Sequence, residues 1–164
     1  MLATVVFIVH NVPQRTEIMN MTQHCFNTFV ATVDRQYEAI LIDNGTADNG
    51  ELLAYLNVQA KRFEQNSPCS RALVIRHDDN EHIAKCWNEA IEASKGEVII
   101  LLNNDVIFNK PGWMDALIDP LNSPGVGAAG GKMMEWNNFI FLEGAFLAFK
   151  KDVALSIAEN GKVF

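Results

Sequence analysis

The chain has few cysteines, and none of them forms a closely spaced pair. Cys25, Cys69 and Cys86 are odd in number and far apart along the 164 residues. Zinc sites and disulfide frameworks depend on paired cysteines at short spacings. Neither feature is expected here, and the cysteine content fits a reducing, cytoplasmic environment.

Long hydrophobic runs are also missing. The opening apolar run, Ala3 to Val9, is short and no basic residue precedes it. A membrane span needs about 20 apolar residues, and a signal peptide begins with a basic segment. This run therefore indicates a buried strand. Peripheral contact with a membrane through a segment outside this chain stays open.

Basic residues are outnumbered by acidic ones. The 13 lysines and arginines face 20 aspartates and glutamates, which gives a net charge of −7 and a pI near 5.0. Non-specific nucleic-acid binding depends on a basic surface. We therefore expect no nucleic-acid partner, whereas an anionic nucleotide could bind where a metal supplies positive charge.

The common glycine motifs of nucleotide-binding and hydrolytic enzymes are absent. The segment after the first apolar run, His10 to Arg15, contains no glycine, so a GxGxxG dinucleotide loop is excluded. No GxxxxGK[ST] loop and no GxSxG elbow occurs either. The acidic pair that a receiver-type signalling domain carries after its first strand is missing too.

What is present is a regular alternation of apolar runs and amphipathic segments. Strands are expected at 4–9, 39–42, 72–75 and 98–102, with helices around 18–33, 52–56 and 83–91 between them. This alternation is typical of parallel βαβ units. We predict an α/β fold in which a mostly parallel open sheet is covered by helices on both faces. The run 98–102 is the most continuously apolar and is expected to be central.

Smaller features complete the prediction. Asp79 or Asn80 is expected to cap the helix at 83–91, and Gly96 to end it. Pro111-Gly112 opens a short helix, and a glycine-rich stretch, 125–131, leads into strand-like segments at 139–142 and 145–149. A last helix is expected near Lys151. The whole, 1–164, is predicted to be one domain.

Three polar clusters follow predicted strands. They are His10-Asn11, the run from Asp43 to Asp48, and Asn103-Asn104-Asp105. Ligands of open parallel sheets bind outside the carboxyl ends of the strands. Each cluster alone is more simply a turn, but three at one sheet edge predict a binding site.

Four segments resemble, in order, those of family-2-type glycosyltransferases of the GT-A fold, rhamnosyltransferase-like members included. They are 40–48 (ILIDNGTAD), 80–99 (NEHIAKCWN followed by ASKGEVI), 101–106 (LLNNDV) and 144–151 (GAFLAFKK). The resemblance implies a nucleotide-binding part at about 1–108 and a partial acceptor-side part at about 109–164. It also implies an enzyme of cell-surface polysaccharide synthesis that moves a sugar from a nucleotide-diphosphate donor to an acceptor hydroxyl, with inversion.

The resemblance also assigns roles to residues. It implies that Asp43, with Asn44 beside it, contacts the nucleotide base, that Asn104 lies near the ribose, and that Asp105 binds Mg²⁺ or Mn²⁺. His10 and Asn11 would line the nucleotide pocket. Such ions take oxygen ligands and neutralise a departing diphosphate. Because Asn103 and Asn104 are neutral, Asp105 is the sole carboxylate of this motif, and metal affinity without nucleotide should be weak.

Other polar and aromatic residues give weaker signals. The run 77–82 is rich in histidine and carboxylates, but carboxylates that precede a helix more simply favour its N-terminus. Trp87 and Trp113 fall on apolar helical stripes and are expected in the core. On the acceptor side, Trp136 is a candidate for sugar stacking. Glu143 and Gly144 are candidates for contact with an acceptor saccharide.

No catalytic residue can be assigned. Inverting transfer needs a general base, which the resembling family carries in an acidic motif beyond the acceptor-side segment. The carboxylates of Asp115, Asp119, Glu143 and Asp152 remain, and no motif selects one. We therefore expect an incomplete fragment of a longer enzyme. A non-catalytic module that binds sugar nucleotides is the alternative.

Overall fold

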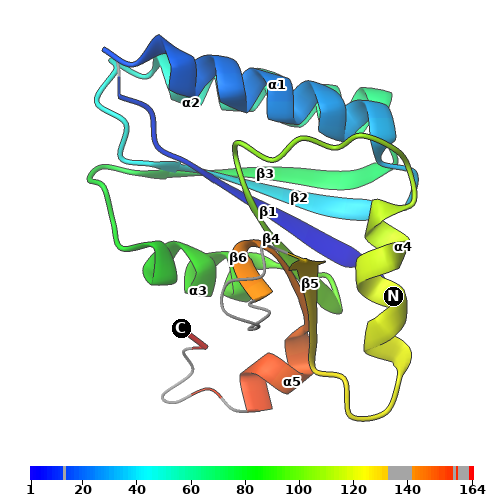
Figure 1. Ribbon diagram of the computed structural model, residues 1–164. Helices are drawn as coiled ribbons and strands as arrows, with labels where there is room; N and C mark the ends of the chain where they lie inside the picture. Colours follow the sequence, from blue (N-terminus) through cyan, green and yellow to red (C-terminus); the bar gives the residue numbers. More distant parts are fainter. Residues whose placement is uncertain (13, 133–141, 157, 159–162) are drawn as a thin grey trace, which may run out of the picture.

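The computed structural model describes residues 1–12, 14–132, 142–156, 158 and 163–164; the side chains of 132 and 142–145 are not part of that description. Within these residues, six strands form one sheet in the order β3-β2-β1-β4-β6-β5 (Figure 1). The strands are β1 (Ala3–Val9), β2 (Tyr37–Asn44), β3 (Cys69–His77), β4 (Val98–Asn103), β5 (Ala128–Lys132) and β6 (Leu142–Lys150). The helices are α1 (Thr16–Thr32), α2 (Glu51–Asn66), α3 (Ile83–Ala93), α4 (Trp113–Ile118) and α5 (Lys151–Ser156), and a 3-10 turn spans Asp119–Asn122.

The helices cover both faces of the sheet, as predicted. Helices α1 and α2 lie on one face and α3 and α5 on the other (Figure 1). Strand residues alternate between the two faces, so Val5 and Phe7 pack towards α1 and α2, and Val6 packs towards α3. Phe7 contacts Phe26 and Phe29 of α1 edge-on, with ring centroids 5.1 and 5.2 Å apart. This aromatic core holds α1 against β1.

Strands β3, β2, β1 and β4 are mutually parallel, and β1 and β4 lie together in the middle of the sheet. The predicted central position of 98–102 is confirmed: these five residues are buried. Beyond β4 the sheet changes direction, because β6 runs antiparallel to β4 and β5 antiparallel to β6. The beginning of β6 therefore lies at the same edge as the end of β4.

Residues 128–131 of the glycine-rich stretch belong to strand β5, which corrects the prediction made for this region. Ala128, Ala129 and Gly130 pair with Phe149, Ala148 and Leu147 of β6. Small residues have weak strand propensity, and here the pairing partner determines the conformation. Of the two strand-like segments expected next, 145–149 belongs to β6, whereas 139–141 lies outside the described residues.

Two details of α3 also differ from prediction. Its N-cap is His82, whose ring accepts a hydrogen bond from the Ala84 N–H at 3.3 Å, and not Asp79 or Asn80. Its C-cap is Ser94 in an extended conformation, so Gly96 does not end the helix. Trp87 packs against the core on the α3 side, and Trp113 against the core on the α1 side, as expected.

Gly96 is needed for close packing. A Cβ at this position would lie 2.5 Å from Thr4 Oγ1 and 2.6 Å from Thr4 N. We expect Gly96→Ala to lower the free energy of unfolding by about 1–3 kcal/mol, since the backbone must move to make room. Urea denaturation measures this change. Gly127→Ala is the matched control, because its Cβ would meet only Val153 Cγ1 at 3.7 Å; an equal loss in both variants would contradict the packing argument.

No helix in the described ranges is long and apolar enough to cross a membrane.

Candidate functional site at the carboxyl edge of the sheet

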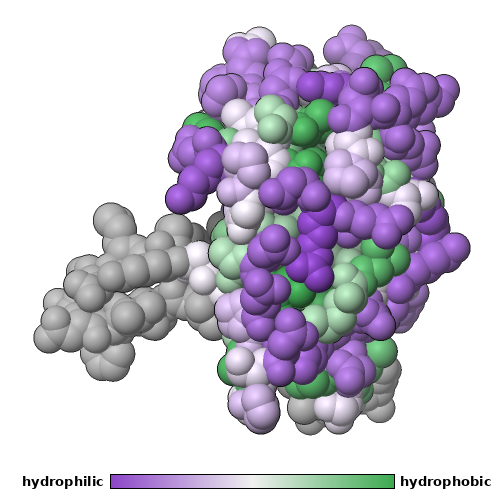
Figure 2. All heavy atoms as spheres, turned by 90° about the vertical axis from the view of Figure 1, so that its right-hand side faces the viewer, coloured by the Kyte–Doolittle hydropathy of each residue, from purple (hydrophilic) through white to green (hydrophobic). Residues whose placement is uncertain are grey.

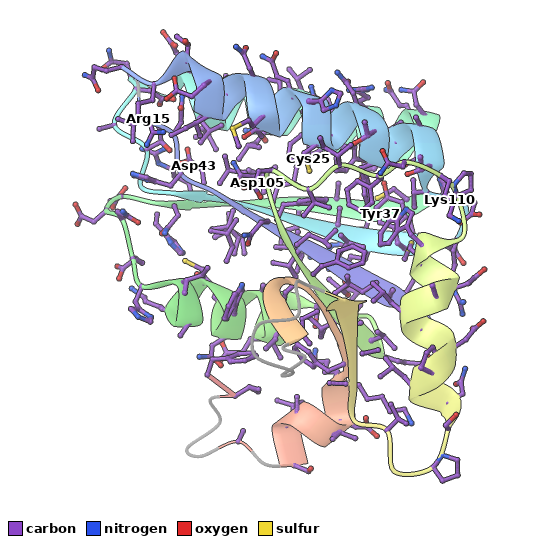
Figure 3. All side chains as sticks on the ribbon, in the orientation of Figure 1. Arg15, Cys25, Tyr37, Asp43, Asp105 and Lys110 are labelled. Carbon is purple, nitrogen blue, oxygen red and sulfur yellow. The ribbon has the colours of Figure 1, made fainter. Side chains whose placement is uncertain are left out.

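The three polar clusters meet at one edge of the sheet. In the parallel register, Val9 of β1 lies beside Asp43 of β2, which lies beside Arg76 of β3, and Ile8 lies beside Asn103 of β4. In Figure 3 Asp43 lies near one end of the sheet and Asp105 lies below α1, while Tyr37 and Lys110 lie towards the opposite end. The predicted convergence at this edge is confirmed by the register.

Asp43 is a buried carboxylate in a fixed position. Its side chain is 0% exposed and pairs with the Arg76 guanidinium. The Thr46 N–H donates to Asp43 Oδ1 at 3.1 Å, and Arg76 Nη2 donates to the Thr46 carbonyl at 2.8 Å. The β2–α2 loop is thus tied back onto the ends of two strands.

Arg76 is the site residue that sequence reasoning missed. It ends an apolar run just as Asp43 does, on the next strand, and the strand alternation puts both side chains on the α1 face. Its side chain is 28% exposed, so it can contact a ligand while it pairs with Asp43. A charged residue at the end of an apolar strand is visible in the sequence. Only the register between β2 and β3 shows that this residue pairs with Asp43.

Asn44 points to the other face, as the next residue along a strand must. Its Nδ2 donates to Asn80 Oδ1 and to the Glu81 carbonyl, both at 2.9 Å, and its Oδ1 accepts from the Glu81 N–H at 3.0 Å. His10 Nδ1 donates to the Asn44 carbonyl at 2.8 Å. These contacts join the β2–α2 loop to the β3–α3 loop, so the Asn44 amide is engaged within the protein.

Gly45 lets the two loops touch. It has a φ of +70°, and a Cβ there would lie 2.0 Å from the Asp79 carbonyl carbon. Only glycine fits a left-handed conformation with so close a backbone neighbour.

Asn11 offers an unused acceptor. Its backbone N–H donates to Thr46 Oγ1 at 2.9 Å, which places it beside the Asp43 loop. Its side-chain oxygen is buried and has no hydrogen-bond partner among the described residues. Buried acceptors of this kind are rare, and a ligand or water normally satisfies them.

Asn104 and Asp105 form the turn after β4. Asn104 Nδ2 donates to Thr22 Oγ1 of α1 at 2.7 Å, which anchors the turn. Asp105 is exposed and makes no hydrogen bond within the described part of the chain. Beneath the turn, Cys25 is buried, and this burial raises the pKa of its thiol to about 12, with a smaller contribution from the nearby Asp105 charge. The thiol is therefore neutral, and Asp105 is the exposed carboxylate of this turn.

The donor set fits a metal that arrives with its substrate. No cluster of three or more histidine, cysteine or acidic side chains that could hold a metal exists among the described residues. A single free carboxylate matches a Mg²⁺- or Mn²⁺-type ion whose other ligands are phosphate oxygens and water. The hollow beside Asp105, lined by Asn20, Met21, His24 and Ile107, has a volume of about 270 Å³, below the usual range for ligand pockets. It can hold only part of a nucleotide sugar.

Of the acceptor-side candidates, the structure describes only the backbone of Glu143 and Gly144. Trp136 lies outside the described residues. Glu143 and Gly144 lie at the start of β6, just before Phe146, which pairs with Leu102. The antiparallel register therefore puts their backbone at the same edge as Asp105.

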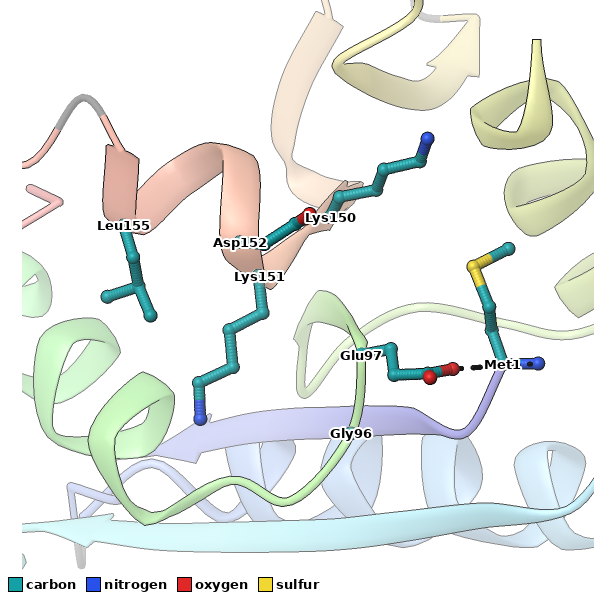
Figure 4. Close-up of a pocket in the computed structure, with 7 residues that line it drawn as sticks. All are labelled: Met1, Gly96, Glu97, Lys150, Lys151, Asp152 and Leu155. Atoms are coloured by element: carbon teal, nitrogen blue, oxygen red, sulfur yellow. Dashed lines mark ion pairs between the residues drawn. The ribbon is translucent and has the colours of Figure 1, made fainter.

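Three of the four unassigned carboxylates lie at the opposite, amino-terminal edge. Asp115 and Asp119 pair with Arg35, which precedes β2, at 2.5 and 3.8 Å. Asp152 lines a cavity of about 530 Å³ with Met1, Glu97 and Lys150, at the amino ends of β1 and β4 (Figure 4). Figure 2 views the molecule from the side of the N-terminus and α4, where hydrophobic residues lie between hydrophilic ones. The 530 Å³ cavity is larger than the hollow beside Asp105 and is also lined by charged side chains, Glu97, Lys150 and Lys151 among them. It lies, however, away from the carboxyl ends of the strands, where ligands of open parallel sheets bind.

The family model described as "Glycosyl transferase family 2" matches residues 4–144, most of the chain. The chain belongs to glycosyltransferase family 2. Two curated relatives match part of the chain. An uncharacterized protein, y4gI, of Sinorhizobium fredii is 26% identical over 102 residues, and the probable polypeptide N-acetylgalactosaminyltransferase 8 of Homo sapiens is 24% identical over 103 residues. Each match covers 62% of this chain, but only 10% and 16% of those proteins.

Solved structures confirm the GT-A fold of this family-2 glycosyltransferase chain. The mannosyltransferase PcManGT of Pyrobaculum calidifontis, in complex with GDP-Man and Mn²⁺, aligns with a TM-score of 0.70 at 14% identity, over 92% of this chain and 44% of that one. The S. aureus TarS 1–349 structure aligns with a TM-score of 0.59 at 16% identity, over 92% and 47%. TarS 1–349 in complex with UDP-GlcNAc aligns at 0.54 and 17%, over 85% and 36%. The chain thus spans less than half of each solved chain.

Proposed function

We propose that this chain is the donor-binding part of an inverting, metal-dependent glycosyltransferase that uses a nucleotide-diphosphate sugar. The observation that carries the proposal is the free, exposed carboxylate of Asp105 at the end of β4. It lies at the edge where Asn11 presents an unsatisfied acceptor and Asp43 a fixed carboxylate. Family membership makes this edge the expected donor site.

The residues suggest how a nucleotide would be held. We propose that the base lies against the Asp43–Arg76 pair, where the partly exposed Arg76 presents a donor and the fully buried Asp43 holds it in place. Asn11 Oδ1 can accept from the base or the ribose, and Asn104 is anchored to α1 beside Asp105. We propose that His10 lines the nucleotide site. The Asn44 side chain would support the site indirectly, because it joins the β2–α2 loop to the β3–α3 loop.

Asp105 would hold a divalent ion, Mg²⁺ or Mn²⁺, which when bound supplies positive charge to the leaving diphosphate. PcManGT, whose complex contains GDP-Man and Mn²⁺, supports this part of the proposal. Glu143 and Gly144, at the start of β6, would face the acceptor side, and Trp136 is proposed as a stacking platform for the acceptor saccharide. The general base is not assigned.

The test is to incubate the chain with Mn²⁺ and a panel of UDP-, GDP- and dTDP-sugars, and to measure nucleotide binding by calorimetry and nucleotide release by chromatography. We expect micromolar to millimolar binding of at least one nucleotide that depends on the metal. Binding without release or transfer, with any saccharide acceptor tried, would instead favour a non-catalytic binding module. No binding of any sugar nucleotide would refute the proposal.

A further inference from the structure

His77 lies behind the proposed nucleotide site in an unusual hydrogen-bonding position. Its Nδ1 is 3.0 Å from Asn44 Oδ1, and its Nε2 is 2.6 Å from Glu89 Oε2. The ring is only 10% exposed, whereas Glu89 is 42% exposed. The nearest hydrogen-bonding atom to each ring nitrogen is an oxygen, while the Cys86 thiol lies farther away, 3.7 Å from Nδ1.

The orientation of Asn44 is determined by its other contacts. The Glu81 carbonyl can only accept, so it marks Nδ2, and the Glu81 N–H can only donate, so it marks Oδ1. The atom that faces His77 is therefore an acceptor. An ionised carboxylate is an acceptor as well. A neutral imidazole has one donor and one acceptor nitrogen. Its acceptor nitrogen would therefore face an acceptor oxygen, either Asn44 Oδ1 or Glu89 Oε2, and that contact would be repulsive.

We propose that His77, with a proton on both ring nitrogens, is a positioning residue that makes nucleotide binding at Asp43 dependent on pH. The proposal rests on the proposed function. Asn44 directly follows Asp43, and its amide joins the β2–α2 and β3–α3 loops, which also touch at Gly45. When the ring loses a proton, either the Asn44 or the Glu89 contact becomes repulsive. The end of β2, with Asp43, and the following loop, with Thr46, then lose support, and nucleotide affinity falls.

Other titratable groups surround the ring and must be separated from it. Cys86 of α3 lies 3.7 Å from Nδ1, and burial raises the pKa of its thiol, so it is neutral. Glu81 and Lys85 form an ion pair at 2.6 Å near the same end of α3. The remaining groups are His10, which follows β1, the exposed Asp78 and Asp79 after β3, and the Asp43–Arg76 pair on the opposite face.

The experiment compares the wild-type chain with His77→Gln, using UDP, GDP and dTDP with Mn²⁺ and calorimetry between pH 5.5 and 8.5. Histidine is the side chain that ordinarily changes charge in this range. Wild-type affinity should fall roughly 2- to 10-fold more across the range than that of His77→Gln, as expected for the loss of one hydrogen bond. Protonation of the nucleotide itself cancels, because it is the same for both proteins.

His82→Asn is the matched control. It removes a nearby exposed imidazole and leaves a good N-cap for α3, so it should keep the wild-type pH profile. Nitrogen NMR shifts of the His77 ring should show both nitrogens protonated at pH 5.5. Identical pH profiles in wild type and His77→Gln, or a neutral ring at pH 5.5, would overturn the inference while the proposed function stands. Absence of nucleotide binding by every variant at every pH would refute the proposed function and, with it, the inference.

Discussion

Asp105→Ala is expected to abolish metal-dependent nucleotide binding and to leave the fold intact. Asp105 is the one carboxylate in the turn after β4, and it makes no hydrogen bond within the described residues. Charge neutralisation by a bound ion contributes several kcal/mol, and each 1.4 kcal/mol is tenfold in affinity. We therefore expect a loss of roughly 100-fold or more in affinity for GDP or UDP with Mn²⁺, measured by calorimetry.

Two comparisons make this result specific. Asp78→Ala removes another exposed aspartate at the same sheet edge, after β3, and should bind nucleotide as the wild type does. Asp105→Ala should also unfold at the wild-type urea concentration, because an exposed side chain with few contacts contributes little stability. Unchanged metal-dependent binding in Asp105→Ala would disprove the metal assignment.

The sheet was largely predictable because its parallel strands are covered on both faces. A strand such as β4 must then be continuously apolar, and this pattern is visible in the sequence without any partner. The polar residues that end these strands are visible in the sequence as well, and they mark the carboxyl edge of the sheet. The antiparallel part was harder to predict, because β5 contains Gly130 and depends on β6 for its conformation.

The finer features of the site depend on contacts between distant residues. Gly96 is needed because Thr4, 92 residues away, approaches its backbone. The resemblance groups Asp43 with Asn44, but the strand alternation sends their side chains to opposite faces. Asp43 consequently meets Arg76, and Asn44 meets His77. Sequence patterns identify the edge, whereas the register between strands decides which residues act together.

Arg76→Ala is expected to lower both stability and nucleotide affinity. Removing the guanidinium leaves the Asp43 carboxylate, which is 0% exposed, without its counter-charge. Unpairing a buried charge costs about 3–5 kcal/mol. We expect a value near the lower limit, about 3 kcal/mol, because Arg76 is partly solvated and Thr46 still donates to Asp43. Urea denaturation gives the stability, and calorimetry with GDP or UDP and Mn²⁺ gives the affinity.

The same two strands supply a matched control at their other end. Arg71 pairs with Glu38 at 2.6 Å, and their side chains are 34% and 1% exposed, close to the values for Arg76 and Asp43. Arg71→Ala should therefore destabilise the protein by a similar amount. Because this pair lies at the amino edge, nucleotide affinity of the folded protein should not change. In Arg76→Ala it should fall at least tenfold, since Asp43 loses the partner that orients it. Equal affinity in the two variants would show that the Asp43–Arg76 pair supports the fold and does not contribute to the site.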